Sequence, residues 1–444
     1  MKQNASFPVA IIGGGPAGLA AVAHLAVRKL PFILFEAGES VASNILSWQH
    51  VKVFSPWRYN IDKAARQLLE STDWIAPDEE ALPTGKELYD AYFKPLSNLA
   101  VLKPFIYTNS KVMAIGRKNM DKMKSWGREE WPFIIQVHHK DEDVRFYEAR
   151  GVIDASGTWN SPNPIGSGGV FAVGEAENND KIHYGIPDVL GREKGRYINK
   201  SIAVVGGGHS AINTIIELDK LKNEYPGTTI HWILRKKNVQ DVYGGQEKDA
   251  LQARGALGIK IEQLVNDDRV NVYTPFQIQE IRSKEGKLVL IGHQHDELLA
   301  LPGIDEIISN TGSRPDFSFL REVRLKIDSS LESSAAIAEL IDPNIHSCGT
   351  VRPHGEGELR HDDEGFYIVG SKSYGRAPTF LMATGYEQVR SVVAAIDGDM
   401  EAARKVELDL PETGVCSSDN IKDSSIACCT ATPVAEKQSA ACCG

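Results

Sequence analysis

The stretch PVAIIGGGPAGLAAVAHL at residues 8–25 decides how the first part of this chain folds. Four apolar residues, Val9 to Ile12, predict a short buried strand, and alanine-rich sequence predicts a helix to about Val27. Between them the spacing G-x-G-x-x-G permits a tight turn, lets a pyrophosphate approach the backbone, and lets the helix pack closely on the strand. The pattern predicts a dinucleotide site, whose candidate contacts are Gly13, Gly15, Pro16, Ala17 and Gly18.

The strand expected next, Phe32 to Phe35, ends in Glu36. A carboxylate at the end of the second strand can accept hydrogen bonds from the hydroxyls of a ribose. Strand, glycine turn, helix, strand and acid together make a dinucleotide site a better interpretation than a plain glycine-rich turn.

A second copy of this pattern is SIAVVGGGHSAINTIIEL at residues 201–218. The next expected strand, Thr229 to Leu234, ends in Arg235, Lys236 and Lys237 rather than in an acid. Basic side chains there favour the 2′-phosphate of NADP over NAD, although a solvated basic edge is the alternative. The candidate contacts of this copy are Gly206, Gly208, His209, Ser210 and Arg235.

Each copy leads into a β-meander and returns to its sheet. Residues 133–138 and 144–149 alternate as a hairpin should, and residues 270–281 and 287–291 take the same place in the second copy. The buried strands that follow end at Ser156 and Gly157 in one copy and at Thr311 and Gly312 in the other. We interpret the repeat as an internal duplication that binds two different dinucleotides.

Length and composition agree with a multi-domain globular protein. The 444 residues suit two or three domains, and 49 basic against 59 acidic residues give a net charge of −10, which disfavours binding to nucleic acid or anionic lipid. The apolar run 9–27 is interrupted by glycines and a proline, so we expect neither a membrane span nor a signal peptide, and a cytoplasmic protein.

The ordered set GGGPAGLA, ASGT (155–158), GGGHSA (206–211), NTGSRP (310–315) and GFYIVG (365–370) resembles the flavoproteins with two dinucleotide-binding domains. These are the flavin monooxygenases and the enzymes similar to thioredoxin reductase and glutathione reductase. The resemblance implies an α/β fold of two Rossmann-like, three-layer ββα domains, with FAD in the first and NADP in the second. It covers most of residues 7–400.

The resemblance also implies a domain order. We expect the first part of the FAD domain at 1–190, the inserted NADP domain at 191–305, and the second part of the FAD domain at 306–410. Residues 411–444 are rich in Ser, Thr, Ala, Asp and Lys, which predicts a flexible, disordered tail.

The family resemblance places the flavin next to GFYIVG. Many relatives have an Asp directly after this motif, whereas Ser371 and Lys372 follow Gly370 here. A helix expected from about Thr379 could direct the positive end of its dipole at the flavin, or could simply be a packing helix. The remaining candidate cofactor contacts, from these regions and from elsewhere in the chain, are Trp48, Val112, Ser156, Gly157, Thr311, Gly312, Gly370, Ser371 and Thr379.

The cysteines bear on the electron acceptor. The reductases of this group pass electrons through a Cys-x-x-Cys or Cys-x4-Cys pair, but no cysteine occurs before Cys348. A monooxygenase needs no redox side chain, because NADPH reduces FAD and oxygen reacts with the reduced flavin in a pocket poor in water. The sequence therefore favours a flavin monooxygenase acting on a small soft or organic nucleophile.

Three residues are candidates for catalysis. Asn60 ends the aromatic-rich loop 44–60 and could place an amide near the flavin, although packing in the core is the alternative. Cys348 is either a buried thiol or a thiol that faces the flavin, because the histidines around it match no zinc pattern. Arg376 could orient a substrate, together with Lys372 and Tyr374.

Five of the six cysteines lie in the last 29 residues. The vicinal pairs suit a soft metalloid or metal ion such as As(III) or Hg(II), although a disordered tail also tolerates cysteines without a role. The chain is similar to flavin monooxygenases of arsenic-resistance gene clusters, which makes an arsenical substrate one candidate. The candidate metal ligands are Cys428, Cys429, Cys442 and Cys443.

Two other functions stay open. One is an NADPH-driven thiol or metalloid reductase that uses the tail cysteines. The other, of a different class, is a protein that sequesters a metalloid and keeps a structural flavin domain. A small-molecule substrate is the partner we expect, and a homodimer is left open as the assembly.

Overall fold

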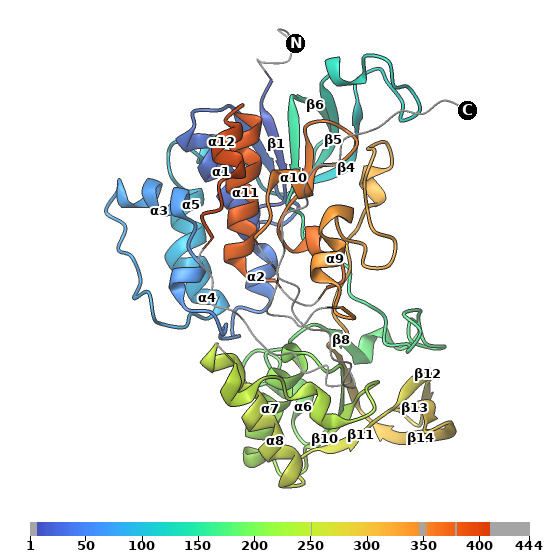
Figure 1. Cartoon of the computed structure of the whole chain (residues 1–444). Helices are drawn as coiled ribbons and strands as arrows, with labels where there is room; N and C mark the ends of the chain where they lie inside the picture. The colour runs from blue at the N-terminus through green and yellow to red at the C-terminus, as the bar shows by residue number, and fades with distance from the viewer. Residues whose placement is uncertain (1–6, 250, 346–350, 352, 378–379, 409–444) are drawn as a thin grey trace, which may run out of the picture.

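The computed structural model describes residues 7–249, 251–345, 351, 353–377 and 380–408. Figure 1 shows two units, with α1, α11 and β1 in the upper one and α7, α8 and β10 in the lower one. Each unit contains a five-stranded parallel sheet and a three-stranded antiparallel meander.

The first sheet has the order β16-β7-β1-β2-β3. Its strands are β1 (Val9–Ile12), β2 (Phe32–Phe35), β3 (Ile106–Tyr107), β7 (Gly151–Asp154) and β16 (Phe366–Ile368). All four residues of β1 are buried because β2 and β7 flank it and both faces of the sheet are covered. The predicted strands at 9–12 and 32–35 are therefore present, at the centre of the sheet.

Helices cover one face of this sheet and a meander covers the other. Side chains along β1 point alternately to the two faces of the sheet. Val9 and Ile11 pack with α1 (Pro16–Val27) and α11 (Met382–Ile396), whereas Ala10 and Ile12 pack against the meander. The meander consists of β4 (Ser110–Arg117), β5 (Phe133–His139) and β6 (Val144–Ala149). The result is the predicted three-layer ββα arrangement.

The second unit repeats these layers. Its sheet has the order β11-β10-β9-β15-β8, formed by β8 (Ile182–Tyr184), β9 (Ser201–Val205), β10 (Thr229–Ile233), β11 (Asn271–Tyr273) and β15 (Glu306–Ser309). Helices α7 (His209–Glu224) and α8 (Gln252–Asn266) pack on one face. The other face carries a meander of β12 (Gln277–Lys284), β13 (Lys287–Gln294) and β14 (Glu297–Ile304).

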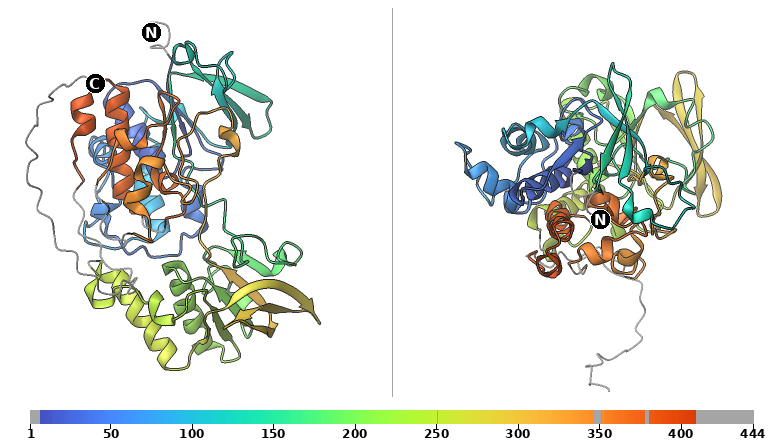
Figure 2. Two further views of the ribbon diagram at one scale, coloured as in Figure 1. Left: turned by 45° about the vertical axis from the view of Figure 1, so that its right-hand side comes forward. Right: turned by 90° about the horizontal axis from the view of Figure 1, so that it is seen from above.

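Both meanders lie on the same side of the molecule in Figures 1 and 2. The fold class is confirmed as α/β with two Rossmann-like units. The second sheet takes strands from 182 to 309, whereas the sequence predicted 191–305 for this unit. The first and last strands of this sheet along the chain, β8 and β15, have only three and four residues, too few to reveal by periodicity which sheet they join.

Shorter helices complete the chain. In the first unit these are α2 (Ser43–Ser47), α3 (Lys63–Glu70), α4 (Gly85–Leu88), α5 (Lys94–Ser97), α9 (Ala338–Ile341), α10 (Glu356–Leu359) and α12 (Met400–Arg404), and α6 (Lys194–Tyr197) precedes β9. Among the described residues, no helix is long and apolar enough to cross a membrane.

Candidate functional site

The first glycine turn joins β1 to α1 at the carboxyl end of the sheet. Gly13 has φ +99°, and a Cβ there would lie 2.7 Å from the Ala155 carbonyl oxygen, so the end of β7 requires glycine at this position. A Cβ on Gly18 would overlap the carbonyl oxygen of Gly13. These two glycines let the helix start directly against the strand, as the sequence predicted.

Gly15 has a different role, because it borders open space. A Cβ added there would meet no heavy atom within 4 Å. Gly15 is also the N-cap of α1 and provides no side-chain cap, and Pro16 begins the helix. The free backbone N–H groups and the helix dipole at this end favour an anion. The open space between the turn at residues 13–15 and the amino end of α1, here called the first cradle, therefore fits a pyrophosphate.

Glu36 joins this cradle to the end of β2. Its Oε2 atom accepts a hydrogen bond of 2.6 Å from the Gly14 amide, while Oε1 accepts from the Gly38 amide at 2.7 Å and from the Ser43 hydroxyl at 3.0 Å. The carboxylate is therefore held against the glycine turn. Oε2 keeps the capacity to accept one more donor, such as a ribose hydroxyl.

The far side of the first cradle is formed by two further turns. Gly157 has φ +70°, and a Cβ there would lie 3.7 Å from the Ser371 hydroxyl. Gly370 has φ +71° and lies against Ala17, whose Cβ would be 3.0 Å from an added Cβ. The structure thus brings the predicted cofactor contacts at 156–157 and 370–371 to the amino end of α1.

The second cradle has the same construction. Gly206 has φ +132°, and an added Cβ would overlap the Asn310 carbonyl oxygen at the end of β15. Gly208 is the N-cap of α7 without a side-chain cap, and an added Cβ would again meet nothing within 4 Å. His209 and Ser210 begin α7, so their backbone amides belong to the open helix end.

Arg235 follows β10 and is exposed beside this cradle. Its Nη1 donates to the Ser167 carbonyl at 3.1 Å, and Lys236 Nζ donates to the Asp241 carbonyl at 2.6 Å. Neither cation is paired with a carboxylate in these contacts. The basic edge therefore fits the 2′-phosphate that the sequence predicted for it.

Two connecting segments run between the units and bond to each other. The Thr311 hydroxyl donates to the Asn163 carbonyl at 2.6 Å, and Asn163 Nδ2 donates to the Thr311 carbonyl at 3.1 Å. Ser313 Oγ donates to Thr158 Oγ1 at 2.9 Å. Gly312 has φ +80°, and a Cβ added there would lie 3.4 Å from Asn163 Nδ2. These bonds fix the connection between the two cradles.

Aromatic rings also cross between the units. The Phe54 ring, from the first unit, lies 5.5 Å from the His209 ring on α7 and 5.8 Å from the Arg254 guanidinium on α8. Burial, together with Arg254, lowers the pKa of His209. Arg254 is held by Asp249 through bonds of 2.6 and 2.9 Å. The sequence indicated Phe54 only as part of the aromatic-rich loop 44–60, and no motif marks Arg254.

Trp48 forms part of a second aromatic contact. Its ring centroid lies 6.3 Å from that of Trp159, two residues after Gly157. Trp48 is partly buried and packs on the first core, so it serves as a wall rather than as a solvent-exposed group. Trp159 was missed, although an aromatic residue directly after ASGT was a signal for it.

Asn60 is fully buried and its amide is engaged within its own loop. Nδ2 donates to the Ser55 carbonyl at 2.7 Å and to the Pro56 carbonyl at 3.0 Å, and Oδ1 accepts from the Ser55 hydroxyl at 2.9 Å. Both amide hydrogens are used. This geometry gives Asn60 a structural role and leaves it no donor for the catalytic role that the sequence suggested.

Other predicted residues separate into interior and surface positions. Val112 is buried in β4, where its side chain packs in the core under the meander. Tyr374 and Lys372 are buried too, so these two do not orient a substrate from an open pocket, whereas Arg376 is exposed. Cys348, Thr379, Cys428, Cys429, Cys442, Cys443 and the tail 411–444 lie outside the described residues.

No metal site accompanies the cradles in the part of the chain that the structure describes. There, no three His, Cys, Asp or Glu side chains are grouped closely enough to hold an ion. His354 contacts Gln388 at 2.8 Å, and His361 accepts a hydrogen bond of 3.0 Å from the Lys326 amide. These two histidines have structural partners.

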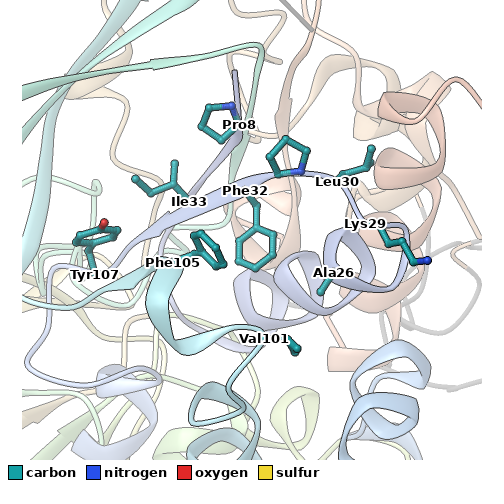
Figure 3. A pocket seen from close by; sticks show the side chains of 10 residues that line it. Pro8, Ala26, Lys29, Leu30, Phe32, Ile33, Val101, Phe105 and Tyr107 are labelled. Atoms are coloured by element: carbon teal, nitrogen blue, oxygen red, sulfur yellow. The ribbon is translucent and has the colours of Figure 1, made fainter. Parts of the chain in front are cut away.

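A cavity of about 490 Å³ lies at the opposite end of the first sheet (Figure 3). Its lining includes Pro8, Leu30 and Phe32, which stand at the amino ends of β1 and β2, and the rings of Phe105 and Tyr107. Ligands of open α/β sheets bind at the carboxyl ends of the strands, where the glycine turns lie. This cavity is therefore separate from the candidate site.

Residues 10–339 match the pyridine nucleotide-disulphide oxidoreductase family. Ferredoxin–NADP reductase 1 of Shouchella clausii is 24% identical over 392 residues, covering 86% of this chain and 90% of that protein. Ferredoxin–NADP reductase 2 of Latilactobacillus sakei is 23% identical over 382 residues, covering 82% and 91%.

Solved structures share the fold at low identity. Bacillithiol disulfide reductase from Bacillus cereus has a TM-score of 0.65 at 18% identity, covering 90% of this chain and 99% of that chain. DfoA, a cadaverine monooxygenase from Erwinia amylovora solved with FAD, has a TM-score of 0.63 at 14% identity, covering 93% and 99%.

Proposed function

The chain belongs to the pyridine nucleotide-disulphide oxidoreductase family, whose members bind FAD and NADP(H), and from this premise we propose that it is a flavin monooxygenase. Its class, an FAD- and NADPH-dependent oxidoreductase, follows from the family. The proposal concerns the acceptor: oxygen, with transfer of one oxygen atom to a small soft or organic nucleophile.

The observation that carries this proposal is the absence of cysteine from residues 1–347. This range contains both glycine cradles, both meanders and the connecting segments between the units. A reductase that relays electrons through a paired dithiol needs that pair close to its flavin. Direct reaction of the reduced flavin with an external acceptor needs only the cofactor and a site that excludes water.

We assign a role in holding one of the two cofactors to the residues of each cradle. When bound in the first cradle, FAD would supply the redox chemistry between NADPH and oxygen. The amino end of α1 and Glu36 would hold the phosphates and ribose of the first nucleotide. The amino end of α7 and Arg235 would hold those of the second. Trp48 and Trp159 add apolar surface beside the Ser156–Gly157 turn.

The substrate class follows from chemistry rather than from a pocket. A soft nucleophile, such as a trivalent arsenical or a thiol compound, accepts an electrophilic oxygen readily. The similarity to arsenic-resistance monooxygenases and the five cysteines among residues 416–443 make arsenicals the first compounds to test.

Oxygen stoichiometry tests the proposal. Purified holoprotein should consume one O₂ per NADPH in the presence of substrate, with an oxygen-18 label from O₂ appearing in the product and little hydrogen peroxide. Methylarsenite, a dithiol and a diamine are suitable first substrates. Formation of hydrogen peroxide alone with every one of them, or full turnover without oxygen, would contradict the proposal.

A second candidate is a reductase that passes electrons to an external acceptor. It is favoured by the similarity to proteins named ferredoxin–NADP reductase, which extends over 86% of this chain. Anaerobic NADPH oxidation with ferredoxin, a disulfide or arsenate would support it. If the tail thiols take part, truncation before Pro411 should abolish the reaction with the disulfide or arsenate and leave NADPH reduction of the flavin intact.

A further inference from the structure

Lys372 is a lysine without solvent exposure at the edge of the first cradle. It stands two residues after Gly370, and the side chains of Lys372 and of its partner Asp154 are both 0% exposed. Charged side chains are almost never fully buried unless they are paired. This position therefore holds a fixed pair of charges inside the protein.

The ammonium group of Lys372 has a complete set of partners. Its Nζ donates to Asp154 Oδ2 at 2.7 Å, to the Ser156 hydroxyl at 3.0 Å and to the Asp316 carbonyl at 2.7 Å. These three acceptors use all three ammonium hydrogens. The Phe319 and Phe317 rings lie 4.5 and 5.3 Å away and close the site from that side.

The pair is attached directly to the cradle. Asp154 ends β7, and its Oδ1 atom accepts a hydrogen bond of 3.0 Å from the Ser156 amide. The Cα of Ser156 lies 2.8 Å from the point where a Cβ on Gly13 would stand. Ser371, next to Lys372, has its hydroxyl beside Gly157. Both charges thus support the turn that borders the first glycine motif.

Stability alone does not explain this arrangement. Removing two charges from water costs as much as their attraction returns, and a pair of well-packed apolar side chains at such a place is often as stable or more so. In a site of low dielectric constant, however, fixed charges act strongly on a neighbouring group whose own charge changes. A flavin that gains electrons is such a group.

We propose that Lys372 and Asp154 are positioning residues that set the reduction potential of the flavin bound in the first cradle. Lys372 stabilises the electron-rich reduced form, Asp154 opposes it, and the bond between them fixes the balance. This inference rests on the proposed function only in that FAD occupies the first cradle. It does not depend on the acceptor.

The charges can be removed one at a time and together. Lys372→Met leaves the carboxylate alone and should shift the midpoint potential of the bound flavin to more negative values. Asp154→Asn leaves the ammonium alone and should shift it to more positive values. The midpoint potential of the double variant should return towards the native value. That of Lys372→Arg should stay close to the native value, because the positive charge is kept. Dye equilibration of the holoproteins, followed by flavin absorbance, measures all four.

A tenfold change in the ratio of reduced to oxidised flavin equals about 30 mV for a two-electron couple, and we expect each single variant to shift by at least this much. Arg128→Met is the control, because it removes a buried cation paired with Asp363 before β16, away from the cradle. Its potential should match that of the native protein. FAD content and thermal unfolding, measured in parallel, report on the structural effect of each change.

Opposite shifts in the two single variants would not arise from a purely structural role, which would weaken FAD binding in both. Equal potentials in all flavin-containing variants, or shifts of the same sign, would overturn the inference and leave the monooxygenase proposal standing. If one single variant does not fold, the other decides by the sign of its shift: Lys372→Met must move to more negative values or Asp154→Asn to more positive ones, with Lys372→Arg near the native value as the reference. A native protein without FAD would instead contradict the proposed function.

Discussion

Some glycines of this protein are needed for its fold, and others are needed for the binding of cofactors. A Cβ on Gly13, Gly18 or Gly206 would meet backbone atoms, whereas one on Gly15 or Gly208 would meet open space. The first three positions therefore preserve the fold, and the other two preserve an empty volume. This difference is testable because only the second kind can change without disturbing the apoprotein.

We expect Gly208→Ala to fold normally and to keep its FAD, but to bind NADPH at least about tenfold more weakly, because the methyl group occupies the space in which a pyrophosphate approaches the backbone. NADPH titration of the holoprotein, followed by fluorescence, measures this. Gly195→Ala is the control, since an added Cβ there also meets nothing within 4 Å but lies in α6. Equal affinity in both variants would contradict the role of Gly208.

His361 makes the first unit sensitive to acid. Burial lowers the pKa of His361 from 6.5 to about 4, and its Nδ1 accepts a hydrogen bond from the Lys326 amide. Because the folded pKa lies below the unfolded one, the stability is complete above pH 6.5 and falls as the pH drops towards 4. The loss by pH 4 is about 3 kcal/mol, at 1.36 kcal/mol per pKa unit.

His361→Asn should remove this part of the pH dependence while keeping an acceptor near the Lys326 amide. Urea unfolding at a series of pH values between 7 and 4 measures the difference in slope. His138→Asn, at an exposed position of β5, is the control and should leave the slope unchanged. An unaltered slope in His361→Asn would show that other groups cause the acid sensitivity.

At the scale of elements, α7 carries a carboxyl group with the opposite behaviour. Burial raises the pKa of Glu217 from 4.5 to about 7, and its Oε2 atom is buried without a hydrogen-bond partner among the described residues. The folded state therefore holds a proton that the unfolded state releases. Stability is highest below pH 4.5 as far as this group is concerned, and falls as the pH rises to 7.

We expect Glu217→Gln to raise the free energy of unfolding by about 1–2 kcal/mol above pH 7, after allowance for partial solvent screening, and to have little effect below pH 4.5. Denaturant unfolding at pH 5 and pH 8 measures this. Glu224→Gln, on the same helix and exposed, is the control. A gain of equal size at both pH values would contradict the titration of Glu217.

The sequence predicts the elements of this fold well where a short local pattern determines them. Val9 to Ile12 with its glycine turn needs only strand periodicity and turn chemistry, and the structure has β1 and α1 at these places. The expected strand at 270–281 instead divides into β11 and β12. Pro275 lies between them and cannot donate to a sheet ladder, so one continuous strand cannot form there.

The site was less accessible to prediction because its contacts join distant parts of the chain. The Lys372 contact with Asp154 spans 218 residues, and Phe54 meets His209 and Arg254 from another unit. The glycines of both cradles were predicted because each motif is local. Asn60 looked like a free amide in the sequence, since only the folded loop shows its bonds to Ser55 and Pro56.

At the scale of the whole molecule, the crossing segments 158–163 and 311–313 join the two units. Thr311 donates to Asn163, and Ser313 donates to Thr158. Thr311→Val combined with Ser313→Ala removes these donors. We expect FAD content to stay unchanged and reduction of the flavin by NADPH to slow by about tenfold or more, because small errors in placement strongly reduce hydride transfer.

Stopped-flow absorbance under anaerobic conditions measures this rate. Thr72→Val is the matched control, since its hydroxyl also donates to a carbonyl, that of Leu69, but at the end of α3 within the first unit. A native rate in the double variant would show that the units keep their orientation without these bonds. The Phe54 contact would then be the next feature to test.

The bonded segments 158–163 and 311–313 make the second unit a domain that can be exchanged between proteins. The second unit leaves and rejoins the first at neighbouring points, since residues 158–163 and 311–313 touch. A module whose ends adjoin adds little loop-closure cost to its host. The nicotinamide module of this chain should therefore be transplantable: another module of the same architecture, spliced at these two points, could supply a new coenzyme preference to an unchanged flavin host.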